Sequence, residues 1–522
     1  MNMESLWNNK WFLAITSGVL LGFSYSPFPL AFLTIPAFVL LLRVTLLTGS
    51  IREMILYTYP TFLIWNAITT YWLLFATVSG GIAAIVANSA IMLIPLAMMR
   101  TMYRSNLSAW LKVPLAAAPW VAYEWLHLQW DLSWPWLAIA NAYSTATFAV
   151  QYIEFTGYLS ISFWVLCVAG WAYIALNEKE KATTWFAAAT LAAMLPVLLS
   201  LILLRTFDDT PDRYLNVVVA QPNFDSYQHL AGYPNPDIPL NGMIALSDSA
   251  RTADSHLVLW PENAIMGGIF ERRPTSRDQT IAFYAQNWGI PVVGGASWYQ
   301  HYDDKELPRV HRLDNQGRPF NIYNSAIGFN PDGTRLVYNK MKLVPIVERF
   351  PFVNQLSRIP FIPVNWPEIS GYGRGREMIL FEADDVLFPA VICYDSVFPA
   401  LVRESVTMGA GFVSVITNDG WWGRTSGHVQ HYDFARLRAI EMRRAVVRSA
   451  NNGISGMINA DGSPHSRTEY WTRTAFEIQV PIYSHLTFYA RTGEWFGWLM
   501  LISGILGWGL ARLRVLGQYK KQ

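Results

Sequence analysis

Long apolar runs with few charged residues fill the chain up to about residue 204, and one more lies near the C-terminus. Because a helix needs roughly 20 apolar residues to cross a bilayer, this pattern predicts eight transmembrane spans. Between the seventh and eighth spans the chain changes to short apolar runs separated by polar residues, Gly and Pro. The predicted spans are 9–26, 28–47, 54–77, 81–103, 108–126, 152–177, 183–204 and 494–513.

This pattern predicts three parts. Residues 1–204 form a transmembrane domain of seven spans, residues 205–493 form a domain outside the bilayer, and residues 494–522 hold the eighth span and a tail. The composition agrees, since 52% of the 522 residues are hydrophobic and only 15% are charged, which is unusual for a soluble protein. The 23 Trp and 25 Tyr residues are typical of the aromatic belts at membrane surfaces. The net charge of +2 gives no indication of a nucleic-acid partner.

The positions of Lys and Arg predict the orientation in the membrane. The loops after the second, fourth and sixth spans carry basic residues, whereas the loops after the first, third and fifth carry none. By the positive-inside rule both termini are cytoplasmic, and residues 205–493 lie on the opposite side, which in a bacterium is the periplasm. The basic residues near span ends are Lys10, Arg43, Arg52, Arg104, Lys179, Lys181, Arg512, Arg514, Lys520 and Lys521.

Within 205–493, strand-like and helix-like segments alternate, which predicts an α/β domain large enough for its own core. A PDG turn separates 324–333 from 335–344 and predicts a hairpin. The other predicted strands are 215–224, 256–262, 290–298, the run that ends at Cys393, 412–419 and a pair within 445–462. The predicted helices are 240–253, 276–288, 397–408 and 428–444.

Two stretches have two interpretations each. Residues 128–136, which are rich in Trp, form either an interfacial anchor or the wall of a lipid passage. Residues 349–376 contain many Pro, Gly and aromatic residues, among them Phe361, Ile362 and Trp366, and interrupt the α/β pattern. Long loops of this kind are usually functional or mobile. This insertion is therefore either a lid that touches lipid or an ordinary loop packed against the domain.

Polar groups follow three predicted strands. Glu262 ends LVLWPE, Lys340 lies in YNKMK with Glu348 eight residues later, and Cys393 follows VLFPAVI. Alone, each has a simple structural explanation, as a solvated strand end or as a buried thiol. Together they supply a nucleophilic sulfur, a carboxylate to accept its proton, and an ammonium to lower the thiol pKa and face an oxyanion. The set predicts acyl transfer through a thioester.

The same residues resemble a known family. WPE, YNK followed by LVP, and CYD are similar to the Glu-Lys-Cys signatures of the nitrilase, or carbon–nitrogen hydrolase, superfamily. With seven spans before this domain and one after it, nearly the whole chain resembles the bacterial apolipoprotein N-acyltransferases. NDGWWG at 418–423, the segment 428–453 and YARTG at 489–493 add to the likeness. The resemblance implies an αββα sandwich for residues 205–493.

The resemblance also implies roles. Cys393 is the nucleophile, Glu262 the general base and Lys340 the oxyanion stabiliser. Glu348 matches a second glutamate that steadies the lysine and the substrate, and Tyr394 matches an aromatic residue that follows the nucleophile.

Two positions depart from the family pattern. Asp395 stands where the family commonly has Glu, one methylene longer, and its role is left open. Ile346 and Val347 replace a usual Phe-Gly pair before the second glutamate.

The implied reaction is a ping-pong transfer. A phospholipid, with the sn-1 chain of phosphatidylethanolamine expected, acylates Cys393. The acyl group then passes to the α-amine of the diacylglyceryl cysteine of an apolipoprotein. No cofactor and no metal are expected, and the protein is expected to act as a monomer in the bacterial inner membrane.

Three alternative functions fit parts of the sequence. The first is a metal hydrolase that uses His428, His431 and Asp433, but their spacing does not fit the zinc-protease helix motif. The second is a membrane-bound amidase that uses the same triad with water as acceptor, although one span would suffice to anchor it. The third is a transporter, which would need broken, charged spans at a midplane site.

Overall fold

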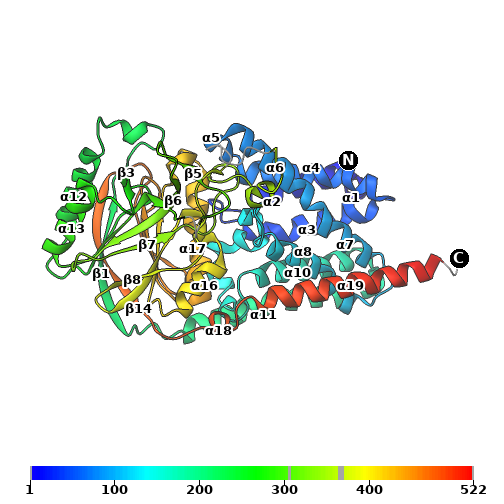
Figure 1. The fold of residues 1–522 in the computed structure, drawn as a ribbon. Helices are drawn as coiled ribbons and strands as arrows, with labels where there is room; N and C mark the ends of the chain where they lie inside the picture. The colour runs from blue at the N-terminus through cyan, green and yellow to red at the C-terminus, as the bar shows by residue number, and fades with distance from the viewer. Residues whose placement is uncertain (1–2, 304–306, 362–369, 520–522) are drawn as a thin grey trace. The chain divides into compact units, whose positions relative to one another are not determined.

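The computed structural model describes residues 3–303, 307–361 and 370–519. The chain folds into two compact units. The helical unit comprises Met1–Asp208 and Thr487–Gln522, and the α/β unit comprises Asp209–Leu486. One unit is built of helices and the other of strands and helices (Figure 1).

Each of the eight predicted spans overlaps at least one helix of the helical unit. Among the described residues, four helical stretches are long and apolar enough to cross a membrane: Val78–Tyr103, Leu159–Asn177, Lys179–Thr206 and Trp495–Leu516. The main helices are α2 (Lys10–Gly22), α3 (Thr34–Leu47), α4 (Ile51–Thr70), α6 (Val78–Ile91), α7 (Leu93–Tyr103), α8 (Ala109–Leu126), α10 (Leu159–Asn177), α11 (Ala182–Thr206) and α19 (Trp495–Tyr519).

The other predicted spans are shorter or more polar than their apolar runs suggest. The helix in the first span has 13 residues, and Pro27 and Pro29 lie between it and α3. Buried hydroxyl groups bond neighbouring helices to one another: Ser17 Oγ donates to Ala37 O at 2.8 Å, and Thr61 Oγ1 donates to Ala14 O at 2.9 Å. Such bonds stabilise helix contacts where apolar burial alone contributes little.

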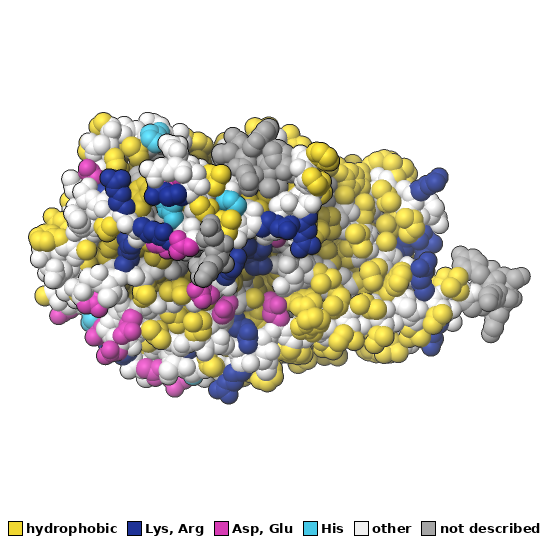
Figure 2. Space-filling view, in the orientation of Figure 1, with side chains coloured by type: hydrophobic (Ala, Val, Ile, Leu, Met, Phe, Trp, Pro, Cys, Tyr) yellow, Lys and Arg dark blue, Asp and Glu magenta, His cyan; other side chains and the backbone are white. Residues whose placement is uncertain are grey.

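The surface of the helical unit is divided by residue type. Figure 2 shows hydrophobic side chains over most of the visible face of this unit. Lys and Arg side chains gather at the end of the unit where both chain termini lie. This distribution is typical of a helical unit with an apolar belt and a basic end.

The Trp-rich stretch 128–136 packs largely into the helical unit. Trp136 is 2% exposed, and Trp134 stacks on it with ring centroids 5.4 Å apart. Trp72 contacts Trp136 at 5.0 Å. Trp130 is more exposed, at 36%, so only part of this stretch has the exposure of an interfacial anchor.

Two sheets form the centre of the α/β unit, one of eight strands and one of six. In the first sheet β14 (Thr474–Ile482), β1 (Arg213–Gln221), β2 (Leu257–Leu259), β4 (Val292–His301), β6 (Pro319–Phe329) and β5 (Arg312–Leu313) follow one another, while β3 (Ile265–Phe270) pairs with β4 and β7 (Arg335–Asn339) with β6. In the second sheet the order is β13 (Pro464–Arg467), β12 (Gly456–Ile458), β11 (Val446–Ala450), β10 (Val413–Thr417), β9 (Val386–Ile392) and β8 (Leu380–Ala383).

The two sheets face each other between two layers of helices. Ser449 Oγ on β11 donates to Ala220 O on β1 at 2.8 Å, which joins the sheets directly. Helices α12 (Asp237–Ala250) and α13 (Ser276–Trp288) cover the first sheet, and α16 (Pro399–Thr407) and α17 (Ser426–Met442) cover the second (Figure 1). Strands in this position are buried on both faces, so they read as continuous apolar runs such as NVVVA in β1. The predicted α/β fold is confirmed.

The sequence pattern missed β3, β5, β8, β13 and β14. Strand β8 follows the insertion 349–376, whose Pro and Gly residues hide the start of the next element. Part of that insertion is described: it contains the short helix α14 (Val353–Leu356), and Phe361 is 93% exposed. Residues 362–369, which include Ile362 and Trp366, lie outside the described residues.

Candidate active site

The three predicted strand ends meet in one buried cluster. Glu262 follows β2, Lys340 follows β7, and Cys393 follows β9. Lys340 Nζ lies 3.4 Å from Glu262 Oε1 and 2.8 Å from Glu348 Oε1. Lys340, Glu262 and Cys393 are 1%, 5% and 8% exposed, so these polar groups act on one another with little screening by water.

Asn324, in the middle of β6, holds both carboxylates. Its Nδ2 donates to Glu262 Oε1 at 2.7 Å and to Glu348 Oε1 at 3.0 Å. Backbone N–H groups bind the two remaining oxygens: Asn418 N donates to Glu262 Oε2 at 2.9 Å, and Val344 N donates to Glu348 Oε2 at 2.7 Å. Each carboxylate is therefore fixed at both oxygens.

Burial and charge set the protonation of this cluster. Burial raises the pKa of Glu262 and the neighbouring Glu348 raises it further, although Lys340 opposes the shift. Burial disfavours the Lys340 ammonium, but Glu348 and Glu262 outweigh that effect, and the pKa of Lys340 lies well above its ordinary value. The lysine thus stays charged, while Glu262 binds a proton more readily than an exposed carboxylate.

Cys393 lies at a sharp turn from strand to helix. It is the first residue of the short 3-10 helix η7 (Cys393–Val397), and its φ of +47° is in the left-handed region, which costs free energy for a residue with a side chain. Burial raises the pKa of its thiol, the nearby Glu262 raises it further, and Lys340 lowers it. The resting sulfur is therefore a thiol rather than a thiolate.

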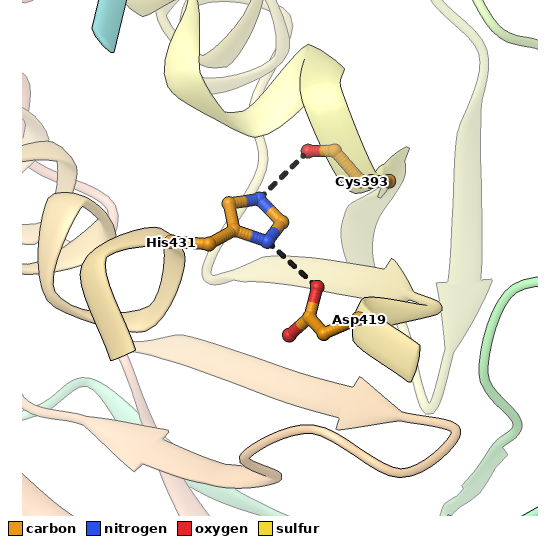
Figure 3. Close-up of side chains that lie close together, drawn as sticks. All are labelled: Cys393, Asp419 and His431. Atoms are coloured by element: carbon orange, nitrogen blue, oxygen red, sulfur yellow. Dashed lines mark hydrogen bonds and ion pairs between the residues drawn. The ribbon is translucent and has the colours of Figure 1, made fainter. Parts of the chain in front are cut away.

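A buried histidine bonds to the backbone of this turn (Figure 3). His431 on α17 lies between Cys393 and Asp419: Nε2 is 3.2 Å from the Cys393 carbonyl oxygen, and Nδ1 is 2.9 Å from Asp419 Oδ1. Ser396 Oγ also donates to the Cys393 carbonyl, at 2.7 Å. The imidazole thus contacts the Cys393 backbone, which differs from the nitrogen–sulfur contact of a Cys-His nucleophile pair.

Asp419 anchors the other side of that imidazole. Thr417 Oγ1 donates to Asp419 Oδ1 at 2.8 Å, and Arg448 lies 3.5 Å from Oδ2. Burial alone would raise the pKa of Asp419, but His431 and Arg448 lower it below its usual value. Asp419 is therefore an ionised partner for His431.

The metal site considered from the sequence is not assembled. Within the part of the chain that the structure describes, the one group with donor atoms close enough for a metal ion is Cys393, Asp419 and His431, and it lacks His428 and Asp433. His428 instead stacks on Tyr470 at 4.2 Å. Because both nitrogens of His431 already lie at hydrogen-bond distance from oxygen atoms, a metal would have to break one of these contacts.

Asp395 connects the turn at Cys393 to the segment that carries Lys340. Its Oδ2 accepts from Tyr338 Oη at 2.8 Å, and its Oδ1 accepts from Lys342 N at 2.7 Å. Those two partners flank Lys340 by two residues on each side. Burial raises the pKa of Asp395 to about 6, although Lys340 opposes the shift. The structure thus shows the hydrogen-bond partners of Asp395, whose role the sequence left open.

Tyr394 and the departures at 346–347 lie around this centre. Tyr394 is 3% exposed and packs edge-on against Phe398, with ring centroids 5.0 Å apart. Ile346 and Val347 are exposed, and Ile346 has a φ of +70°, which is rare for a β-branched residue.

A cavity of about 210 Å³ is lined by residues that adjoin Glu262. Asn263, the neighbour of Glu262, and Asn418, whose N–H binds Glu262, both line it. Gly267 and Gly268 form part of its wall. Its mixture of amide, hydroxyl and carboxylate groups suits a polar part of a substrate.

Four residues of the site have no role in the motif assignment: Asn324, Asn418, Asp419 and His431. Asn418 and Asp419 begin the NDGWWG stretch, and His431 lies in HVQHYDF. Both stretches contribute to the family resemblance, but the resemblance gives these three residues no role in the site. Asn324 is a polar residue inside a buried strand, and such residues usually have a specific partner.

Two families match this chain. Residues 233–482 match the family described as Carbon-nitrogen hydrolase, and residues 17–171 match the Apolipoprotein N-acyltransferase N-terminal domain. Among solved structures, a carbon–nitrogen hydrolase superfamily protein from Xanthomonas campestris is similar over 51% of this chain and 90% of its own, at 18% identity and a TM-score of 0.36.

Curated relatives extend the match to nearly the full length. An apolipoprotein N-acyltransferase from Chlorobaculum tepidum is 28% identical over 93% of both chains. Apolipoprotein N-acyltransferase 2 from Treponema denticola is 26% identical over 74% of both chains. The two matched domains and these relatives together show that the chain belongs to the apolipoprotein N-acyltransferase family.

Proposed function

We propose that this protein completes lipoprotein maturation by transferring a fatty acyl group from a phospholipid to the amino terminus of an apolipoprotein. The observation that carries the proposal is the buried cluster of Lys340, Glu262 and Glu348 beside Cys393, in a chain whose relatives are named apolipoprotein N-acyltransferases. The donor proposed is phosphatidylethanolamine, through its sn-1 ester.

In the first half-reaction the Cys393 sulfur attacks the ester carbonyl carbon. Glu262 takes the thiol proton as the carbon–sulfur bond forms, and the lysophospholipid leaves with that proton on its hydroxyl group. Lys340 faces the developing oxyanion, which an ammonium in a buried site stabilises strongly. Because burial and Glu262 raise the pKa of the thiol, a base beside the sulfur is needed at the moment of attack.

In the second half-reaction the α-amine of a diacylglyceryl cysteine attacks the thioester. Glu262 accepts a proton from the amine, an amide forms, and the sulfur leaves and recovers its proton. The raised pKa of Glu262 suits a group that must accept and return a proton in both steps. The low exposure of the cluster supports transfer to an amine over hydrolysis by water.

The proposed membrane arrangement has eight spans, with both termini in the cytoplasm and residues 205–493 in the periplasm of a bacterial inner membrane. Four helical stretches with the length and hydropathy of spans support it. The basic side chains gathered at the end of the helical unit that carries both termini also support it (Figure 2). In this proposal the protein works as a monomer.

Intact-mass analysis of the full-length protein tests the covalent step. After incubation with phosphatidylethanolamine, the mass should rise by one acyl group, and hydroxylamine should remove it. The Cys393→Ala variant should show no such gain. Adding a peptide that begins with a diacylglyceryl cysteine should then discharge the acyl group and yield an N-acylated peptide.

Two results would contradict the proposal. One is a native protein without adduct, or an adduct that persists in Cys393→Ala. The other is an acyl-enzyme that releases free fatty acid at the same rate with and without the peptide, which would indicate a hydrolase that uses water.

A further inference from the structure

We propose that a groove in the helical unit binds one acyl chain of a glycerophospholipid, and that the ester carbonyl of this chain accepts a hydrogen bond from His127. The groove has a volume of about 560 Å³ and lies among α7, α8 and α19. Its walls are almost entirely apolar, as an acyl chain requires. The side chains that define it include Ile94, Met98, Pro119, Leu126 and Ile505.

The length of the groove matches one leaflet of a bilayer. It extends along α8 from Pro119 to His127, which at the rise of an α-helix is about 12 Å. Half of a typical hydrocarbon core is about 15 Å. Two of the helical stretches that form the groove, Val78–Tyr103 and Trp495–Leu516, have the length and hydropathy of membrane spans, so lipid is the medium expected around it.

His127 places an unused hydrogen-bond donor at the polar end of this groove. Trp130 Nε1 donates to His127 Nδ1 at 2.9 Å. An indole N–H can only donate, so Nδ1 is the acceptor and Nε2 carries the proton. That Nε2–H has no hydrogen-bond partner among the described residues, although His127 is only 6% exposed. A buried donor without an acceptor costs free energy, which a ligand oxygen would recover.

The ring of His127 is fixed in this orientation. It stacks on Tyr123 with centroids 5.3 Å apart and an angle of 24° between the planes, and it packs against Trp130 at 5.5 Å. Tyr123 Oη is itself bonded to Asn88 Oδ1 at 3.1 Å. The donor is therefore held in place before any lipid binds.

The adjacent apolar wall determines which lipid oxygen is the acceptor. Leu126 and Tyr123 lie beside His127 in the groove wall, so an acceptor at His127 must be followed directly by an apolar chain. The ester carbonyl of a phospholipid has this arrangement, whereas its phosphate lies beyond the glycerol. This site concerns the helical unit alone and stands whether or not Cys393 forms an acyl-enzyme.

Photolabelling of the full-length protein in nanodiscs tests the proposal. The probe is a phosphatidylethanolamine with a diazirine in one acyl chain, and its adducts are located by peptide mass spectrometry. We expect labelling of the groove segments of α7, α8 and α19 to exceed labelling of the exposed face of α11 around Leu191 and Leu195, which are 68% and 69% exposed. Unlabelled diester phosphatidylethanolamine should compete at the groove at several-fold lower concentration than its diether analogue, which lacks the carbonyl oxygens.

Variants assign that preference to one side chain. In His127→Leu the diester and diether lipids should compete equally, and His127→Gln, which keeps an N–H donor, should restore part of the preference. His465→Leu, at an exposed position on β13, is the matched control and should behave as the native protein. Cys393→Ala should label like the native protein, which separates this test from the acyl-transfer test.

Three outcomes would overturn the proposal: groove labelling no higher than that of α11, equal competition by the two lipids in the native protein, or a diester preference that survives in His127→Leu. If His127→Leu does not fold, Ile505→Trp provides the test instead. Ile505 is 56% exposed, so the larger ring should fill the groove from outside and lower groove labelling while α11 labelling stays constant. Unchanged groove labelling in that variant would equally refute the site.

Discussion

Replacing Asp395 with asparagine removes the charge of a fully buried carboxyl group and keeps its shape. In the native protein the pKa of Asp395 is raised from its ordinary value of 3.8 to about 6, chiefly by burial. A difference of about two pKa units corresponds to about 3 kcal/mol of stability. The folded protein therefore holds the charged form of this residue at a cost, which asparagine avoids.

The sign of the pH dependence follows from the direction of this shift. A carboxyl group whose folded pKa is raised contributes its stability below the unfolded pKa and loses it as the pH rises through the folded pKa. Here the loss falls between about pH 4 and pH 6. We therefore compare the free energy of unfolding of Asp395→Asn with that of the native protein. The difference should grow in favour of the variant by about 2 kcal/mol as the pH rises from 4.5 to 7.5.

Asparagine can satisfy both native partners of the carboxylate. Its Oδ1 can accept from Lys342 N–H, and its Nδ2 can donate to the Tyr338 hydroxyl oxygen, which accepts as readily as it donates. The Tyr338 hydroxyl hydrogen and the second amide hydrogen then lose the carboxylate as an acceptor. That cost does not depend on pH, so the pH dependence of the stability difference isolates the charge effect. Tyr338→Phe serves as a control, since losing the hydroxyl that lowers the Asp395 pKa should widen the difference between Asp and Asn.

Thermal unfolding of the full-length protein in nanodiscs at pH 4.5 and pH 7.5 measures this effect. A change of about 2 kcal/mol in a domain of this size should appear as a relative rise in Tm of about 4–8 °C for Asp395→Asn at the higher pH. A Tm difference that does not depend on pH would refute the raised pKa. A difference that shrinks as the pH rises would show that Lys340 stabilises the charged form more than burial disfavours it.

Two further predictions concern Cys393, the proposed nucleophile. Lys340→Ala should slow alkylation of Cys393 by iodoacetamide near neutral pH, because the ammonium lowers the thiol pKa. An unchanged rate would show that Lys340 does not lower the pKa of this thiol. His431→Leu should lower the single-turnover rate of Cys393 acylation by about tenfold, because the loss of one hydrogen bond changes the free energy by about that factor. The KM for the phospholipid should change less. His431→Gln should restore part of the rate. His428 lies on the same helix as His431, and its ring stacks on Tyr470. An equal loss in His428→Leu would show general damage to α17 instead.

The sequence could predict the three strand ends because each depends on a local pattern. Glu262, Lys340 and Cys393 all follow short apolar runs, and the structure places each one directly after, or within three residues of, a strand. Their convergence depends on which strands pair in each sheet and on how the two sheets face each other, since β9 belongs to a different sheet from β2 and β7. The turn at Cys393 depends on backbone geometry, which no residue type in AVICYDS specifies.

The rest of the site depends on pairings between distant elements. Asn324 meets Glu262 across 62 positions in the sequence, and the imidazole of His431 reaches the backbone of Cys393 across 38. Neither spacing follows from a helix or strand period. In the helical unit, apolar runs located the helices, but prolines and buried polar residues made several of them shorter than the runs themselves.

The geometry also gives a physical reason for the proposed division of work between the two glutamates. The cluster contains two carboxyl groups and one ammonium in a site with little water, so it carries an excess negative charge unless one carboxyl group binds a proton. Lys340 lies closer to Glu348, at 2.8 Å, than to Glu262, at 3.4 Å, and Glu262 has the raised pKa and the electrostatic coupling to Cys393. Glu262 is thus the group suited to exchange protons with the sulfur and the incoming amine. Glu348 is suited to hold the ammonium in place.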